Sequence, residues 1–319
     1  MISHLLCLLA GLVLPRLVPL ILAQVQRTGS SEAYDEDDTL VLNLDSPTSR
    51  WHNMGWWVLG GTESFAEAAA EHCRRVAFAA NLKPGQRVLE VGYGSGDSAL
   101  LLAKEFTPSS YTGYTSIPAQ QAVAAQRAFK ADLSPTQYRL LCGDAAEDLG
   151  SLAPESIDSV LAVDCAFHFS RRIAFFRSAH TVLSPSSTLA LSDLLLPSSP
   201  LTLLDRILLR LLCLAAGLPY ANLLTASQYR ASLVAAGFDT DDIEMQDISE
   251  HVWPGFLAWM DKREDELGRS RNVLGNAWNG LRGYAKVVRW YSGSNGGRSR
   301  LRFYLISARK SGGIVAEAR

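Results

Sequence analysis

The residues best suited to chemistry are three glycines at alternate positions, Gly92, Gly94 and Gly96, which follow the apolar segment 87–91. The next segment, 98–103, is apolar again and has helical character. A strand that ends in a glycine turn and leads into a helix is how open α/β sheets bind nucleotide-like ligands. Glycine suits the turn because a Cβ would block positive φ angles and the close approach of a ligand. The free N–H groups of the helix would face a negative group.

This turn alone is compatible with a nucleotide-like ligand, with a dinucleotide or with no ligand at all. Residues 94–99 also fit the dinucleotide pattern G-x-G-x-x-A, and a glycine turn can exist without any ligand. A nicotinamide-dependent oxidoreductase needs an acidic residue about 20 residues beyond the glycines to bind the ribose hydroxyl. Thr115 and Ser116 occupy that place, so the sequence disfavours the dinucleotide interpretation.

The remaining chain must position the turn. Strand-like and helix-like segments alternate along it, which predicts an α/β fold with a Rossmann-like, seven-stranded, mostly parallel sheet and helices on both faces. Polar residues recur where the predicted strands end, at Thr115, Asp144, Asp164 and Asp193. Because ligands of such sheets bind beyond the carboxyl ends of the strands, we expect these side chains to lie along one edge.

The ends of the chain differ from this domain in composition. Residues 1–26 are almost wholly apolar, which predicts a membrane anchor or an interfacial helix; a cleaved signal peptide and a buried arm are the alternatives. Residues 27–50 are predicted to be a polar linker. The domain is predicted over 51–310, with a helical cap at about 197–240 and a tail at 311–319. We expect a membrane-associated protein whose folded domain faces the cytosol.

Composition also narrows the partners. The formal net charge is −2 and there is no long basic run, so nothing favours binding to nucleic acid. The five cysteines lie far apart and form no zinc-ligand spacing, which indicates reduced thiols and no metal site. Nothing in the composition indicates an oligomeric state.

Five motifs in order resemble those of the class I S-adenosylmethionine-dependent methyltransferases, in particular the branch with sterol, tocopherol, cyclopropane-forming and small-molecule O-methyltransferases. They are Glu90–Gly96, Gly113–Gln120, Gly143–Ala145, Asp164–Arg171 and Val182–Pro185. The resemblance covers roughly residues 55–247. It implies methyl transfer from S-adenosyl-L-methionine to a small, lipophilic molecule such as a sterol, terpenoid, prenylated aromatic or polyketide. A methyltransferase-like protein that binds without catalysing is the alternative from another class.

The resemblance implies a role for each matching residue. Glu90 and the backbone of Gly92–Gly96 would hold the methionine moiety, and Asp164 would lie near the sulfonium. Thr115 and Gln120 would lie along the ribose. Thr115 stands where other class I enzymes carry an acidic ribose ligand, which is usual for this branch.

The adenine would be bound after the third strand. The resemblance implies that Asp144 accepts a hydrogen bond from the adenine amino group and that Ala145 donates one to the ring. A second departure from the family pattern, Ser184–Ser187 in place of Lys-Pro-Gly-Gly, lies away from the expected cofactor.

His168 is the candidate general base, because a methyl acceptor that loses a proton in the transition state needs one. It follows the fourth predicted strand, and Asp193, near the end of the fifth, could orient it. Related sugar O-methyltransferases use a histidine and an aspartate at similar places. The alternative is that His168 packs between Phe167 and Phe169 and only supports the cofactor site.

Aromatic residues on both sides of the predicted site are candidates for contact with the acceptor. Trp56 and Trp57 precede the core, and Phe169 follows His168; ordinary hydrophobic packing is the alternative for the tryptophans. Residues 201–217 are strongly apolar and could form an amphipathic lid, a membrane-contacting helix or a buried core helix.

Overall fold

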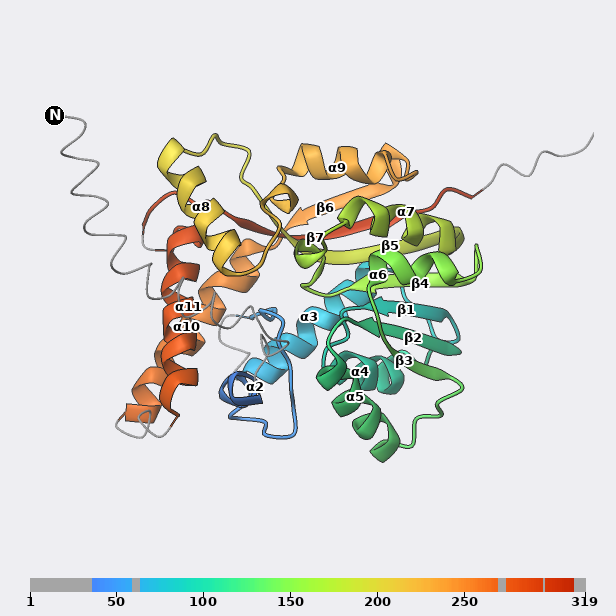
Figure 1. Cartoon of the computed structure of the whole chain (residues 1–319), viewed down its shortest axis with the longest axis horizontal. Helices are drawn as coiled ribbons and strands as arrows, with labels where there is room; N and C mark the ends of the chain where they lie inside the picture. The colour runs from blue at the N-terminus through green and yellow to red at the C-terminus, as the bar shows by residue number, and fades with distance from the viewer. Residues whose placement is uncertain (1–35, 59–63, 269–273, 295, 313–319) are drawn as a thin grey trace, which may run out of the picture.

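The computed structural model describes residues 36–58, 64–268, 274–294 and 296–312 of the 319-residue chain. The strands in this part are β1 (Arg87–Val91), β2 (Ser110–Thr115), β3 (Tyr138–Cys142), β4 (Ile157–Ala162), β5 (Leu183–Leu195), β6 (Ile243–Asp247) and β7 (Arg302–Arg309). They form one sheet of order β3-β2-β1-β4-β5-β7-β6, in which β7 runs antiparallel to both neighbours and the other pairs are parallel (Figure 1). The predicted α/β sheet is confirmed.

Helices cover both faces of this sheet (Figure 1). One layer contains α3 (Phe65–Ala79), α4 (Asp97–Glu105) and α5 (Pro118–Lys130), and the other contains α6 (Ala145–Asp148), α7 (Arg172–Val182) and α9 (Ala226–Val234). Successive residues of β1 serve opposite layers: Val88 packs in the core with α3 and α4, and Leu89 and Val91 pack in the core with α7 and α9. Burial on both faces explains why the parallel strands are nearly continuous apolar runs.

The predicted polar linker over 27–50 is partly wrong. Within it, α2 (Glu36–Leu42) is a helix that packs against α11 (Gly275–Ser292). Val41 and Asn43 are buried. The side chain of Val41 is part of the hydrophobic core, and the side-chain amide of Asn43 donates to the carbonyls of Thr39 and Trp51. A few buried side chains thus outweigh the acidic composition of the segment.

The predicted cap over 197–240 also divides differently. Its first part is α8 (Leu203–Ala215), which leads to the short 3₁₀ helix η3 (Tyr220–Asn222). Its second part, α9, belongs to the sheet layer, since Tyr229 and Leu233 are fully buried in the core with α7. A helical pair between β6 and β7, formed by α10 (Ser249–Leu267) and α11, stands beside the sheet at the left of Figure 1.

The predicted hydrophobic helix over 1–26 lies outside the described residues. Within the described part of the chain, no helix combines the length and the apolar character that crossing a bilayer requires.

Two glycines inside helices give a matched test of the packing. A Cβ on Gly255 of α10 would lie 2.0 Å from the Cβ of Trp57, whereas one on Gly280 of α11 would meet no atom within 4 Å. We expect Gly255→Ala to lower the free energy of unfolding by about 1–3 kcal/mol or more through overpacking. Gly280→Ala should raise it by roughly 0.5–1 kcal/mol, since alanine is the better helix former. Chemical denaturation of both variants measures the difference, and equal stabilities would contradict the assigned contact.

Candidate cofactor and acceptor site

The glycine turn follows β1 as predicted. Gly92, Gly94 and Gly96 have φ values of 77°, 57° and 91°, a region that favours glycine. A Cβ on Gly92 would lie 2.6 Å from Sγ of Cys165, whereas one on Gly94 would meet no atom within 4 Å. The loop is therefore packed against the segment after β4 at one end and open in its middle, and it leads into the N-terminal N–H groups of α4 at Asp97.

Glu90 supports this loop from inside the protein. Its side chain is buried on the α3–α4 face, where Oε2 accepts a hydrogen bond from Tyr111 Oη at 2.6 Å. Oε1 has no partner among the described residues. Burial raises the pKa of the carboxyl to about 7. Its contact with the methionine moiety stays a prediction.

The residues predicted for ribose and adenine lie after β2 and β3. Thr115 Oγ1 donates to Gln120 Oε1 at 2.9 Å, which joins the strand end to the first turn of α5. Asp144 is exposed and is the N-cap of α6, where it accepts from Ala146 N at 2.8 Å. Ala145 is the first residue of α6, so its N–H has no intrahelical acceptor. An exposed carboxylate beside a free N–H matches the donor and acceptor edge of an adenine.

Asp164 is held in an unusual conformation at the end of β4. Its φ is 53°, and its N–H donates to Ser192 Oγ at 2.9 Å. Oδ2 accepts from the backbone N–H of Met54 at 2.8 Å, and Oδ1 is buried without a partner in the described chain. Burial raises the pKa of this carboxyl to about 8. The open oxygens of Glu90 and Asp164 and the open face at Gly94 suit the positively charged methionine end of S-adenosylmethionine.

The expected pair of His168 and Asp193 is not formed. Asp193 is fully buried: Arg172 Nη1 and Tyr229 Oη donate to Oδ2 at 3.0 and 2.7 Å, and the N–H of Leu194 donates to Oδ1. His168 is exposed instead, and its ring lies 4.4 Å from that of Phe167. A buried carboxylate takes the strongest donors within reach, and here these come from α7 and α9.

The sequence analysis missed the network around Asp193. Arg172 Nη2 donates to the carbonyl of Asn222 at 2.7 Å, and the Asn222 amide donates to the carbonyls of Phe167 and Phe169 at 2.9 and 2.8 Å. Asp193 therefore positions the loop that carries His168 through two intermediaries. No local signal identifies these partners, because Arg172 is the first residue of α7 and Asn222 lies 50 residues away in sequence.

The two tryptophans predicted to contact the acceptor are packed among other aromatic residues, and their contact with an acceptor stays a prediction. Trp56 stacks on His251 with 4.3 Å between ring centroids, and Trp57 packs against Phe65 and Trp259. Both border a pocket of about 970 Å³ over β6 and β7, which does not include the glycine loop or Asp164. The aromatic character of the segment is explained by its attachment to α3 and α10.

The other predicted acceptor residue, Phe169, is half-buried. Its ring meets Phe175 edge-on at 5.1 Å. Together with its carbonyl bond to Asn222, this contact fixes the loop after His168. Its contact with an acceptor stays a prediction.

Comparisons with known proteins decide between the possible ligands of the site. A family model described as a methyltransferase domain matches residues 89–191, from β1 to β5. The O-methyltransferase rstn1 of Aspergillus nomiae is 30% identical over 164 residues, which cover 51% of this chain and 70% of that protein. The chain belongs to the S-adenosylmethionine-dependent methyltransferases. S-adenosyl-L-methionine is therefore the cofactor of this methyltransferase, and the dinucleotide interpretation is set aside.

Other relatives agree with this family. Erythromycin 3''-O-methyltransferase of Saccharopolyspora erythraea is 29% identical over 272 residues, 82% of this chain and 83% of that protein. The structure of the mycolic acid cyclopropane synthase CmaA1 with SAH and CTAB has a TM-score of 0.66 at 17% identity and covers 90% of this chain and 98% of that one. The [4+2]-cyclase SpnF has a TM-score of 0.63 at 23% identity, with coverages of 86% and 94%. Both structures show the fold alone.

Glu90→Gln should flatten the dependence of stability on pH. The pKa of Glu90 in the folded chain is about 7, above its ordinary value of 4.5. The folded state therefore keeps a proton that the unfolded chain loses, and this stability is full below pH 4.5 and lost as the pH rises through 7. The loss amounts to roughly 3 kcal/mol.

Urea denaturation of the unchanged chain and of Glu90→Gln at several pH values measures this slope. Glu250→Gln, at a side chain that is 83% exposed, is the control. Identical slopes for the unchanged chain and Glu90→Gln would contradict the assignment.

Proposed function

We propose that this methyltransferase transfers the methyl group to a small lipophilic acceptor, such as a sterol, terpenoid, prenylated aromatic or polyketide. The observation that carries the proposal is the setting of Asp164. Met54, whose N–H binds this carboxyl, also accepts from Tyr284 Oη at its Sδ, at 3.3 Å. Tyr284 Oη in turn lies 3.4 Å from Tyr291 Oη on the same helix, α11. The carboxyl predicted to lie near the sulfonium therefore has a thioether and two phenol rings next to it, and such surroundings at the methyl group suit a largely apolar acceptor.

The names of relatives support the same class. They include erythromycin 3''-O-methyltransferase, 27-O-demethylrifamycin SV methyltransferase of Amycolatopsis mediterranei and sterol 24-C-methyltransferase erg-4 of Neurospora crassa. The first two names place the modified position at oxygen, and the third names a sterol that is modified at carbon.

The mechanism requires little covalent chemistry from the protein. The cofactor, when bound, supplies both the methyl group and its leaving group. The chain must align the acceptor in line with that bond and exclude water. Asp164 would hold the methionine end of the cofactor beside the acceptor, and His168, which is exposed on the loop after β4, would remove the acceptor's proton.

The test of this function is incubation of the purified full chain with S-adenosylmethionine carrying an isotopically labelled methyl group and a lipid extract of the source cell. Mass spectrometry of the extract should reveal a labelled lipophilic product and identify the atom that was methylated. Cofactor binding without any labelled product would favour a non-catalytic binding protein. Conversion without a label would favour a reaction of another type, as the name of the cyclase SpnF illustrates for this fold.

His168→Ala should lower kcat by about 10²- to 10⁴-fold, the usual contribution of a general base. The dissociation constant for S-adenosylhomocysteine should stay within about twofold, since the ring has no hydrogen-bond partner in the described part of the chain. Calorimetry and turnover measurements on the product found above separate the two effects. Phe167→Leu, which removes the neighbouring ring, is the control for packing. Equal losses of kcat and cofactor affinity in His168→Ala would indicate structural support instead.

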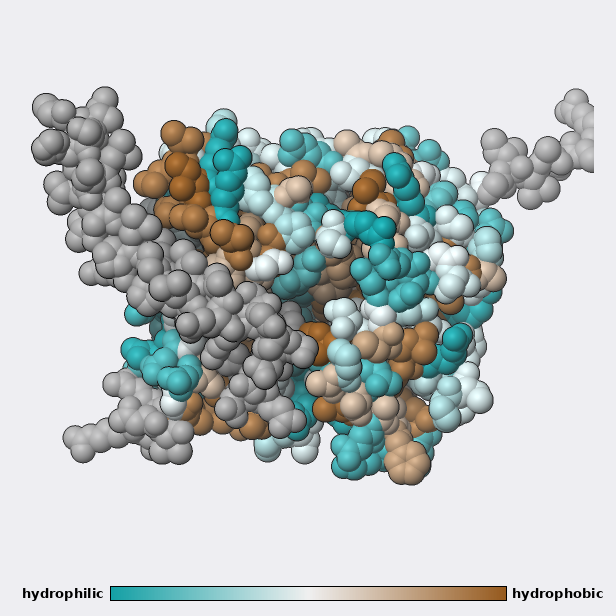
Figure 2. Space-filling model, in the orientation of Figure 1, coloured by the Kyte–Doolittle hydropathy of each residue, from teal (hydrophilic) through white to brown (hydrophobic). Residues whose placement is uncertain are grey.

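We also propose that the enzyme is membrane-associated, with its folded domain facing the cytosol. The sequence 1–26 is apolar, and α8 presents Leu203 and Leu214 to solvent with 74% and 69% of each residue exposed. Figure 2 shows this hydrophobic surface over α8. Free cysteines at four described positions, Cys73, Cys142, Cys165 and Cys213, agree with a reducing compartment.

The membrane proposal predicts that the full chain floats with vesicles made from a lipid extract of the source cell in a density gradient. Deletion of residues 1–26 should abolish or strongly reduce flotation while leaving cofactor affinity unchanged. Leu203→Gln with Leu214→Gln in the full chain should weaken flotation by a smaller factor, because fewer apolar groups leave the bilayer. Replacement of the exposed Phe129 of α5 by Gln is the control. Undiminished flotation of the deletion variant would contradict the proposal.

A further inference from the structure

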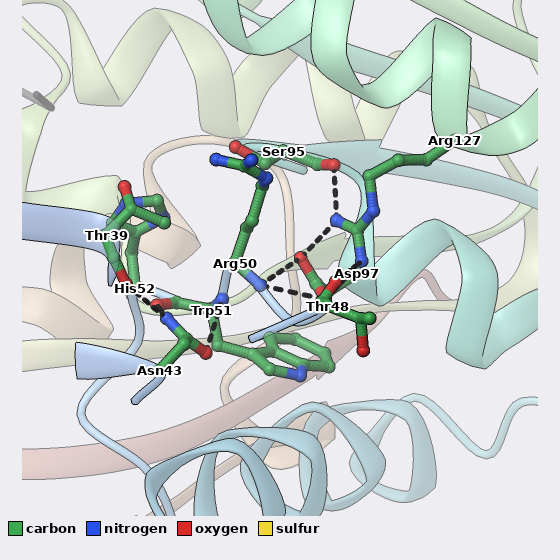
Figure 3. A network of polar contacts seen from close by, with 9 residues as sticks. All are labelled: Thr39, Asn43, Thr48, Arg50, Trp51, His52, Ser95, Asp97 and Arg127. Carbon is green, nitrogen blue, oxygen red and sulfur yellow. Dashed lines mark hydrogen bonds and ion pairs between the residues drawn. The ribbon is translucent and has the colours of Figure 1, made fainter. Parts of the chain in front are cut away.

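Arg127 of α5 joins three parts of the chain that lie far apart in sequence. Its guanidinium binds the carboxylate of Asp97, the carbonyl of Ser95 in the glycine loop, and the carbonyl of Thr48 (Figure 3). Thr48 belongs to the segment 43–58, called here the arm, which enters the domain ahead of α3. One side chain thus contacts the cofactor loop, the helix that follows it and the arm.

The carboxylate at the centre of this junction is fully occupied. Arg127 Nη1 and Nη2 bind the two oxygens of Asp97 at 2.5 and 2.6 Å, and the backbone N–H of Arg50 lies 3.2 Å from both oxygens. The exposed fractions of the two side chains are 7% for Asp97 and 17% for Arg127. Asp97 is the first residue of α4, so the junction lies directly after the glycine loop.

The loop itself is held by the same helix. Arg127 Nη1 donates to the carbonyl of Ser95 at 2.7 Å, between Gly94 and Gly96. A Cβ on Gly96 would lie 2.9 Å from that of Ala124, one turn earlier on α5. The loop therefore has α5 against one side and takes its hydrogen bond from Arg127.

The arm is bound at two places on the site and is braced internally. Its internal bonds join Asn43 to the backbone of Trp51 through both the amide and the carbonyl of the side chain (Figure 3), and its first external bonds are those of Arg50 and Thr48 to the Asp97–Arg127 junction. Farther along, Met54 donates to Asp164 at the end of β4. Between the junction at Asp97 and the bond at Asp164, the arm passes along the edge of the sheet where β1 and β4 end.

We propose that the Arg127–Asp97 ion pair holds the arm closed beside the glycine loop and thereby slows the release of the cofactor and its product. The inference rests on binding of S-adenosylmethionine at this loop. The arm is bound to Asp97 at one end of the site and to Asp164 at the other, so a ligand held between these two residues would leave only after the arm detaches at one end. Arg127 is a positioning residue in this account, because it acts through the loop and the arm.

The chemistry of arginine explains why this residue stands there. A guanidinium has five N–H donors in a planar fork and serves both carboxylate oxygens and two carbonyls at once. Lysine has the same charge but donates from a single atom, so Arg127→Lys keeps the charge and loses the geometry. Asp97→Asn keeps an acceptor for Arg50 N–H and removes the charge.

The matched control is a second forked pair on the other end of α4. Arg74 Nε and Nη2 bind the two oxygens of Glu105 at 2.7 and 2.8 Å. That pair joins α4 to α3 and contacts neither the arm nor the glycine loop. Arg74→Lys therefore removes the same kind of interaction without touching the proposed device.

The experiment measures the affinity and dissociation rate of S-adenosylhomocysteine by calorimetry and stopped-flow displacement in the full chain. It also measures hydrogen exchange of residues 43–58 and the melting temperature. We expect Arg127→Lys and Asp97→Asn to speed dissociation at least tenfold and to increase exchange in the arm without ligand. Arg74→Lys should leave both unchanged. These readouts need no acceptor.

Each other outcome decides against the proposal. Unchanged dissociation and exchange in folded Arg127→Lys and Asp97→Asn would overturn it, as would equal changes in Arg74→Lys. A fall in melting temperature without a change in dissociation rate would make the pair purely structural. Failure of the unchanged chain to bind S-adenosylhomocysteine would overturn the cofactor assignment as well. If the unchanged chain binds it and the variants release it at the same rate, only the role of the ion pair in holding the arm closed is overturned.

Discussion

The site depends on carboxylates that are buried where the parallel strands end. A charged group removed from water is costly unless ion pairs or hydrogen bonds replace its solvation. Asp193 obtains them from Arg172 and Tyr229, and Asp97 obtains them from Arg127 and the backbone of Arg50. These requirements decide which helices lie beside the site and in what orientation.

The completeness of each partner set separates structural carboxylates from those open to a ligand. Asp193 and Asp97 have donors on both oxygens. Glu90 and Asp164 each have one bound oxygen and one buried oxygen without a partner in the described chain. Burial raises the pKa of both open groups, to about 7 and about 8. The two open groups flank the glycine loop, where a bound cofactor would supply the missing donors or positive charge.

The sequence predicted the sheet and its edge well, because both follow from local patterns. Gly92, Asp144 and Asp164 lie within two residues of the ends of β1, β3 and β4, so their place at one edge is implied by parallel pairing alone. The partner of Asp193 was predicted wrongly, and the surroundings of Trp56 and Trp57 were left open between a ligand and ordinary packing. Asp193 could have bound any donor brought to it, and the tryptophans could have faced a ligand or α10. Composition does not distinguish these cases, because the partners come from elements tens to hundreds of residues away.

By itself, the sequence determined the fold class, the glycine turn and the kind of cofactor. These depend on the alternation of strand-like and helix-like segments and on short contiguous motifs. Only the tertiary structure decided the partner of each polar side chain. In the structure, Asp193 binds Arg172 and not His168. Trp56 stacks on His251, and Arg127 pairs with Asp97. The physical reason is that a buried charge or ring takes its partners from whatever the fold places within a few ångströms. That choice depends on contacts between distant segments, which local patterns do not encode.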